Sequence, residues 1–500
     1  MRTDSANPVF STAELKQKSI FGAMWTFGAQ GGKLLLQMLS VVLLARLLAP
    51  EDYGLFGMAA VFTQMVFIVK DLGLSQAAVQ KKTLLPEESS ALFWINVLFV
   101  TVLAAVCCVC APLVAAFYDE PRLAAVVAVS SAANLIVGLS AQHKAILQRQ
   151  LRMKELAFVE VLSKAISLVS GVAGALCGLR YWALVLATIA DAAAHTLLLW
   201  FFCRWKPALV SLSHGRECLK FGLDVAAFNL MNFFSRNIDK ILVGKFHPVE
   251  VVGYYNKAYQ AVSFPIQHLR GPILQVANPA LARLQDDPEK FRNYYRRLLS
   301  VLAFVSVAPV ALFIPLAEEF VLVLLGRQWI PASGTFALLA VSALIQPVAS
   351  TRGSVLVAAG KSRAYFAWGV VNTVCTVSAF AIAAPRGIEA MALGYAVVNY
   401  GLLLPSWIFC ARGTPVRWMD FFSTVWRALA GGGVVIAAGF LCADVLCADC
   451  GPVARLCATV PFAMASWLLY WLAVPGGRAM LKTLRGDLDE AFRKFRRSGK

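Results

Sequence analysis

Charged residues are scarce in this sequence of 500 residues: only 15% are Asp, Glu, Lys or Arg, whereas 59% are hydrophobic. Ordinary soluble domains are about one quarter charged, and a soluble protein of this size would be unable to bury so much apolar surface. Apolar segments of about 20 residues, the length that crosses a bilayer as a helix, recur throughout the chain. The composition therefore excludes a soluble protein and predicts an all-α polytopic membrane protein.

The sequence also lacks the motifs of common catalytic sites. It contains no Walker-type phosphate loop, no HExxH motif and no Gly-x-Ser-x-Gly elbow, and its five histidines are scattered. We therefore expect neither an enzyme nor a metal site, and no bound cofactor. The net charge of +18 is spread through short loops rather than gathered on one domain, which disfavours nucleic-acid binding.

Most of the twelve cysteines lie within apolar segments, where cysteine acts as a small hydrophobic residue. Cys442, Cys447 and Cys450 differ, because they cluster around one short loop. A disulfide is an alternative there if the loop is extracytoplasmic, and a metal site is less expected because no histidine lies nearby. The sequence leaves the state of these three thiols open.

We expect about fourteen membrane spans. Of the 46 Lys and Arg residues, 31 lie on one side of these spans and six lie on the other side. The side with 31 comprises the N-terminal segment, every second loop and the tail. Because cytoplasmic loops carry the excess of Lys and Arg, both termini are expected in the cytoplasm, with the chain in the cell inner (plasma) membrane. The predicted spans are 20–46, 53–70, 90–116, 123–142, 156–178, 182–203, 219–243, 252–275, 298–316, 332–356, 365–384, 389–410, 422–442 and 454–474.

The two halves of the chain resemble each other. Phe21-Gly22 opens the first span and Phe221-Gly222 the seventh, and LLAPEDYGLF at 47–56 matches KFHPVEVVGYY at 245–255. Repeats of six spans enter the membrane in the same orientation, so we expect two bundles related by a pseudo-twofold axis around a central cavity. The expected parts are a cytoplasmic segment (1–19), two six-helix bundles (20–203 and 219–410), two additional C-terminal helices (422–474) and a basic cytoplasmic tail (475–500).

Charged side chains lie within several predicted spans, above all between Phe221 and Tyr255. A charge that faces lipid costs at least ~3 kcal/mol at the helix centre, so we expect these groups to face protein or water. Taken with Lys33 and Lys257, basic groups outnumber acidic ones in the predicted interior, which favours an anionic substrate such as a phosphate or pyrophosphate. The substrate-binding candidates are Lys33, Arg236, Lys240 and Lys257, and the candidates for a coupling proton or sodium ion are Asp224 and Asp239.

Two further acid–base pairs are spaced by one helical turn within a span. Glu160 and Lys164 suit a local ion pair, and Asp191 and His195 have the same spacing. We interpret both pairs as structural, with a proton relay as the alternative for Asp191 and His195.

Three stretches of the sequence are similar to one known family. The segment ARLLAPEDYGLF at 45–56 resembles the connection between the first two spans of polysaccharide transporters. The segment IDKILVG at 238–244, followed by GYY at 253–255, resembles their seventh and eighth spans, and LQRQLR at 147–152 their loop before span five. The family is that of the Wzx-type lipopolysaccharide and exopolysaccharide flippases, within the multidrug/oligosaccharidyl-lipid/polysaccharide exporter superfamily.

This resemblance covers roughly residues 15–475 and implies a function. It implies that undecaprenyl-pyrophosphate-linked oligosaccharide repeat units are moved from the cytoplasmic to the periplasmic leaflet by alternating access. The implied partners are the lipid-linked oligosaccharide and the lipid bilayer, with a polysaccharide polymerase and glycosyltransferases as candidate protein partners.

Other functions stay open from the residues alone. A multidrug or cation antiporter shares the architecture, but we expect it to have surplus acid in its interior. A flippase for another lipid-linked precursor has the same physical requirements. A lipid-sugar polymerase or ligase commonly needs a sizeable extracytoplasmic loop, and the outer loops here are very short.

Overall fold

The computed structural model describes residues 12–69, 85–211, 233, 237–482 and 486. Every regular element among these residues is helical. Within a bilayer a helix satisfies its own backbone hydrogen bonds, which is why apolar segments with few charges fold this way. The chain divides into two compact units, Met1–Gly253 and Tyr254–Lys500.

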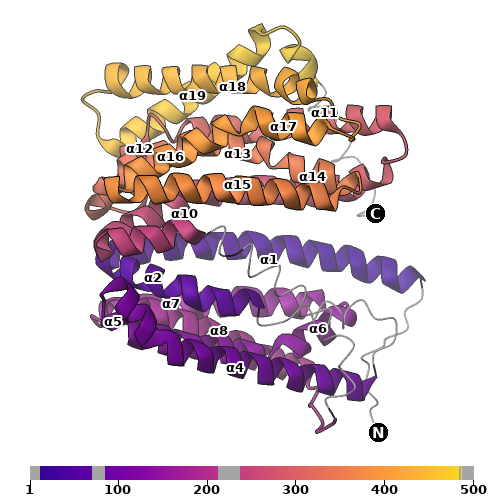
Figure 1. Ribbon diagram of the computed structural model, residues 1–500, viewed down its shortest axis with the longest axis vertical. Helices are drawn as coiled ribbons and strands as arrows, with labels where there is room; N and C mark the ends of the chain where they lie inside the picture. Colours follow the sequence, from indigo (N-terminus) through magenta and orange to yellow (C-terminus); the bar gives the residue numbers. More distant parts are fainter. Residues whose placement is uncertain (1–11, 70–84, 212–232, 234–236, 483–485, 487–500) are drawn as a thin grey trace. The chain divides into compact units, whose positions relative to one another are not determined.

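The first unit contains long helices that run alongside one another (Figure 1). Helix α7 packs against α1 and α8, and α5 packs against α2, α4 and α8. The helices are α1 (Thr12–Leu47), α2 (Pro50–Val69), α4 (Pro86–Tyr118), α5 (Arg122–Gly138), α6 (Ala141–Arg149), α7 (Met153–Leu176) and α8 (Trp182–Cys203), followed by a helix at 237–246 and the start of α10 (Val249–Arg283).

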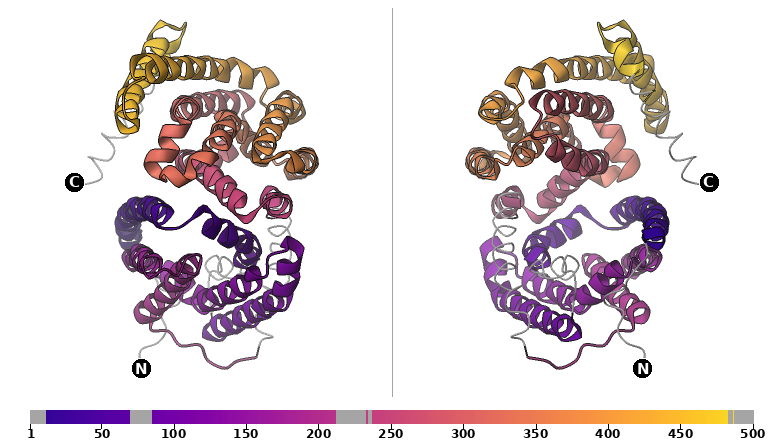
Figure 2. Two further views of the ribbon diagram at one scale, coloured as in Figure 1. Left: turned by 90° about the vertical axis from the view of Figure 1, so that its left-hand side faces the viewer. Right: turned by 90° about the vertical axis from the view of Figure 1, so that its right-hand side faces the viewer.

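The second unit begins within α10, and several of its helices are seen nearly end-on in Figure 2. Helix α11 packs against α13 and α18, and α16 packs against α13 and α15. The helices are α11 (Pro288–Ala311), α12 (Ala317–Leu324), α13 (Ser333–Ala349), α14 (Thr351–Ala358), α15 (Ser362–Ala383), α16 (Ile388–Gly401), α17 (Leu403–Ala411), α18 (Trp418–Phe440) and α19 (Pro452–Ala473), with short 3₁₀ turns at Arg327–Ala332 and Ala384–Arg386 and a π-helical turn at Leu441–Leu446.

Eleven helices among the described residues are long and apolar enough to cross a membrane, and each covers one predicted span. Two further predicted spans, 53–70 and 252–275, fall on α2 and α10. The remaining one, 219–243, lies largely outside the described residues. The all-helical polytopic fold is therefore confirmed, whereas the count of fourteen stays a prediction.

The matching motifs at 47–56 and 245–255 contact each other directly within the first unit. A Cβ atom on Gly54 would overlap the carbonyl oxygen of Val249 and lie 2.7 Å from its carbonyl carbon. A Cβ atom on Gly253 would overlap the carbonyl oxygen of Pro50 and lie 2.9 Å from its carbonyl carbon. Each glycine thus meets the residue four positions before the other glycine, which is the reciprocal pattern of a local two-fold relation.

Ion pairs connect the helix ends beside the contact between Gly54 and Gly253. Arg122 pairs with Glu120 and Glu51, each at 2.8 Å, and the hydrogen bond from Arg122 lowers the pKa of Glu120. Lys245 donates to the carbonyl oxygen of Phe117 at 2.7 Å and pairs with Asp119 at 3.0 Å. The turn after α4, the start of α5 and the end of the helix at 237–246 are therefore tied together.

In the second unit, a buried carboxylate joins α18 to α11. Asp420 has 3% of its side chain exposed. It accepts two hydrogen bonds from the Arg292 guanidinium, at 2.6 and 2.7 Å, and one from the backbone N–H of Arg417 at 2.8 Å. The bidentate geometry fixes the orientation of both helices, so α18 is anchored to α11.

The loop between α18 and α19 holds Cys442, Cys447 and Cys450 as free thiols. Arg455 of α19 organises the loop, since it donates to the carbonyl oxygens of Cys447 and Ala448 and to Glu319. A disulfide is therefore not needed to shape this turn.

Candidate functional site

Lys33 of α1 forms an ion pair with a carboxylate of a neighbouring helix. Its Nζ lies 3.0 Å from Oε2 of Glu160 on α7. The other carboxylate oxygen, Oε1, lies 3.3 Å from Nζ of Lys144 on α6. One carboxylate therefore serves two lysines from two other helices, and the cluster of Lys33, Glu160 and Lys144 keeps one surplus positive charge.

Lys33 belongs to a polar face of α1 that spacing alone could have revealed. Thr26, Gln30, Lys33, Gln37 and Ser40 follow one another at intervals of three and four residues, so they share one side of the helix. Thr26, Gln30 and Gln37 are exposed, and Lys33 and Ser40 are partly exposed. We call these five residues the α1 polar face. Because polar groups that face lipid are costly, this face requires water or polar partners.

The position of Lys33 along α1 places it within the hydrocarbon core. The apolar part of the helix ends at Leu47, which is 14 residues beyond Lys33 and hence about 21 Å away at about 1.5 Å per residue. A bilayer core is about 30 Å thick. An amine at this depth needs a counter-ion, and Glu160 supplies it.

Two expected ion pairs within single helices are wrong. Glu160 pairs with Lys33 and Lys144 rather than with Lys164, and Lys164 pairs with Asp191 of α8 at 2.6 Å. Asp191 thus accepts from Lys164 rather than from His195, and its Oδ1 accepts no hydrogen bond. The helices are packed closely enough that partners on α1, α6 and α8 replace the residue one turn away.

The other predicted site residues are only partly within the described structure. Lys240 lies on the helix at 237–246 and donates to Oδ1 of Asn237 at 2.9 Å, beside the buried Asp239. Arg236 and Asp224 lie outside the described residues. In the first unit, Lys33 and Lys240 therefore each contact a polar side chain, that of Glu160 and that of Asn237.

Lys257 lies in the second unit on α10. It is 5% exposed, and its Nζ lies 3.4 Å from Oε1 of Gln260, one turn away. A buried lysine retains its charge only with polar surroundings, and the expectation of a polar interior around Lys257 stays a prediction.

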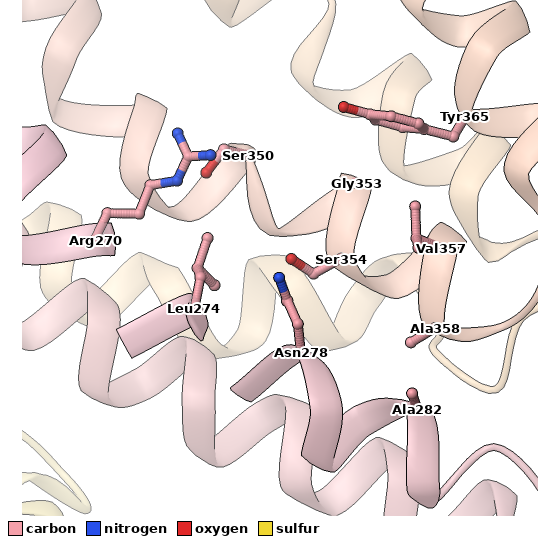
Figure 3. A pocket seen from close by; sticks show the side chains of 10 residues that line it. All are labelled: Arg270, Leu274, Asn278, Ala282, Ser350, Gly353, Ser354, Val357, Ala358 and Tyr365. Atoms are coloured by element: carbon pink, nitrogen blue, oxygen red, sulfur yellow. The ribbon is translucent and has the colours of Figure 1, made fainter. Parts of the chain in front are cut away.

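The second unit also contains a pocket with a volume of about 310 Å³, which the sequence interpretation missed. Figure 3 shows one face of α10 along one side of it, opposite side chains of α14, with Tyr365 of α15 at its edge. The spacing of the α10 residues by four was the available signal. The lining residues are Arg270, Leu274, Asn278, Ala282, Ser350, Gly353, Ser354, Val357, Ala358 and Tyr365.

The chemistry of these groups suits a charged or hydroxyl-rich ligand. The pocket offers a guanidinium, an amide and several hydroxyls, which hydrogen-bond to phosphate or sugar oxygens. Among the described residues, no group of three side chains could hold a metal ion. The site is therefore equipped for binding and orientation.

Comparison with known proteins first defines the class. The fold is similar to that of a solved structure, "Lipid II flippase MurJ, inward closed conformation", with a TM-score of 0.68 and 14% identity, covering 90% of this chain and 98% of that chain. At this identity the likeness establishes the fold alone, that of a multi-pass helical membrane protein.

The family follows from the sequence match. Residues 43–334, more than half of the chain, match the family described as "Polysaccharide biosynthesis protein", and the chain belongs to this family. It is 26% identical to the lipopolysaccharide biosynthesis protein WzxC of Escherichia coli (strain K12), over 77% of this chain and 79% of that protein. It is also 26% identical to the teichuronic acid biosynthesis protein TuaB of Bacillus subtilis (strain 168), over 77% of this chain and 81% of that protein. The protein is thus a multi-pass inner-membrane transporter of polysaccharide biosynthesis rather than an enzyme.

Proposed function

We propose that the protein moves undecaprenyl-pyrophosphate-linked oligosaccharide repeat units from the cytoplasmic to the periplasmic leaflet. The observation that carries the proposal is the family match over residues 43–334 in a chain with charged groups inside its membrane helices. The lipid tail of such a substrate stays in the bilayer, whereas its sugar and diphosphate head needs polar surroundings throughout the passage. The α1 polar face, Lys257 and the pocket beside Arg270 supply such surroundings.

Within this function, the cations meet the diphosphate and the acids couple the transport to an ion. The cations are Lys33, Arg236, Lys240 and Lys257, and the acids are Asp224 and Asp239, with a proton or sodium ion as the coupling ion. The substrate head is proposed to pass along the polar groups within the membrane helices. A polysaccharide polymerase and glycosyltransferases would act beside the transporter.

A deletion strain tests the function. Without the protein, lipid-linked repeat units should accumulate on the cytoplasmic side and surface polysaccharide should be lost, as measured by lipid extraction and mass spectrometry. Wild-type protein should restore export. Normal polysaccharide together with sensitivity to organic cations would indicate a drug antiporter, and accumulation of another lipid-linked precursor would change the substrate.

The same strain tests the cations. Lys33→Ala and Lys257→Ala should lower export at least about tenfold, because a hydrogen bond to a charged group contributes about 1.5–3 kcal/mol. Lys290→Ala is the control, since this exposed lysine pairs only across one turn with Asp287. Equal export by all three variants, at equal protein levels in the membrane, would remove the lysines from the site.

The orientation is proposed from the distribution of Lys and Arg. The basic side carries 31 of these residues and the other side six, so both termini are placed in the cytoplasm. Reporter tags at the two ends should both be inaccessible from the periplasm. Tags on opposite sides would require an odd number of spans.

A further inference from the structure

We propose that Glu160 is an exchange counter-ion for Lys33. It holds Lys33 while the substrate site is empty and releases it to the diphosphate of the substrate, while Lys144 continues to balance the carboxylate. This inference rests on the proposed function and adds to it a residue that positions the binding lysine.

The geometry allows one lysine to leave without the other. Lys33 contacts Oε2 of Glu160 at 3.0 Å, and Lys144 contacts Oε1 at 3.3 Å. The two lysines lie on different helices, α1 and α6. When Lys33 turns away, Glu160 therefore retains an ion pair, and no uncompensated carboxylate is left within the membrane helices.

The accessibility of the pair permits exchange. The side chains of Lys33 and Glu160 are 29% and 30% exposed, so neither is sealed in the protein core. An ion pair that water reaches along the α1 polar face is weak, and a diphosphate offers more negative charge and more acceptor oxygens than one carboxylate. The pair is therefore strong enough to position Lys33 and weak enough to be displaced.

The α1 polar face gives the substrate head a route to Lys33. Gln30 and Gln37 flank the lysine on the same side of the helix and are exposed. Their amides can hydrogen-bond to sugar hydroxyls and phosphate oxygens. A head group that reaches Lys33 thus meets donors on either side of it along the helix.

The neighbouring pair, Lys164 with Asp191, provides an internal contrast. It lies one turn along α7, and its atoms are 2.6 Å apart, but Oδ1 of Asp191 accepts no hydrogen bond. Release of Lys164 would leave Asp191 without a second cation, so this pair is expected to stay closed.

Binding measurements on the full-length protein test the exchange. Affinity for undecaprenyl pyrophosphate is measured in nanodiscs for the wild type, Glu160→Gln, Asp191→Asn and the double variant Lys33→Gln/Glu160→Gln. Glu160→Gln should bind about three- to fivefold more tightly, since it removes a weak competing ion pair. The double variant should lose this gain, and Asp191→Asn should stay within about twofold of the wild type.

Transport provides the second readout. Glu160→Gln should export more slowly despite its tighter binding. Without the carboxylate, no counter-ion competes with the diphosphate for Lys33, so release of the product is slower. Glu160→Asp is the second variant, to be used if Glu160→Gln does not fold. It keeps the negative charge but shortens the side chain, so it should give a smaller gain in affinity than the one expected for Glu160→Gln.

The outcomes separate this inference from the proposed function. If the wild type binds and Glu160→Gln has the same affinity as the wild type, the exchange role alone is overturned. The same holds if Asp191→Asn gains as much affinity as Glu160→Gln. A wild type that binds neither undecaprenyl pyrophosphate nor inorganic pyrophosphate would overturn both.

Discussion

Gly54→Ala and Gly253→Ala are each expected to destabilise the protein by about 3 kcal/mol or more. At both positions the added methyl group would overlap a backbone carbonyl oxygen, that of Val249 or that of Pro50. A flexible side chain could move aside, but a carbonyl within a helix moves only with its helix. Overpacking of this kind typically costs about 1–3 kcal/mol and occasionally more, a large part of a total stability of about 5–15 kcal/mol.

The matched control lies on the same helix as Gly253. Gly271 of α10 has no atom within 4 Å of its ideal Cβ position. Gly271→Ala should therefore be neutral or stabilising by up to about 1 kcal/mol, because alanine favours helix over glycine. Fluorescence-detected size-exclusion chromatography with thermal unfolding measures all three variants. A normal monodisperse peak for Gly54→Ala would show that the two helices do not cross this closely.

Arg292→Ala is expected to destabilise the second unit by about 3 kcal/mol. Asp420 is 3% exposed and depends on the guanidinium for two short hydrogen bonds. Removal of one partner from a buried ion pair costs about 3–5 kcal/mol when it leaves the other charge uncompensated, whereas here Nε of Arg296 stays 3.8 Å from Oδ1 of Asp420. The backbone N–H of Arg417 remains as a donor to Asp420, which places the expected loss at the lower end of this range.

A second pair on α11 provides the comparison. Lys290 pairs with Asp287 on the surface, where the lysine side chain is 74% exposed. Lys290→Ala should cost no more than about 1 kcal/mol. The double variant Arg292→Met/Asp420→Leu should recover much of the lost stability, since apolar side chains can replace a buried pair. Thermal unfolding in detergent measures each change, and equal stability of Arg292→Ala and the wild type would contradict the anchoring role of Asp420.

The helices were predictable because their cause is local. Apolar segments of membrane-spanning length are visible in the sequence, and eleven of the predicted spans are confirmed as helices with the required length and composition. The matched positions of Gly54 and Gly253 were also visible in the repeat. Their direct contact was not, because a repeat shows that two segments are alike without showing that they touch.

The ion pairs were less predictable because their cause is tertiary. Spacing by four residues favoured a pair between Glu160 and Lys164, which is the rule for an isolated helix. In the folded chain, Glu160 meets Lys33, which is 127 residues away in sequence. The α1 polar face was predictable from the sequence, since its members recur at helical spacing. Charge alone, however, identifies Lys33 and not its uncharged neighbours.

The sequence by itself determined that the chain is helical, crosses the membrane repeatedly and belongs with transporters of polysaccharide biosynthesis, since length, hydropathy and local motifs carry these properties. Only the tertiary structure decided which acid balances which lysine and where a pocket opens beside Arg270. The physical reason is that a charge inside a membrane takes whichever partner lies within a few ångströms, and helix packing rather than chain order sets that distance.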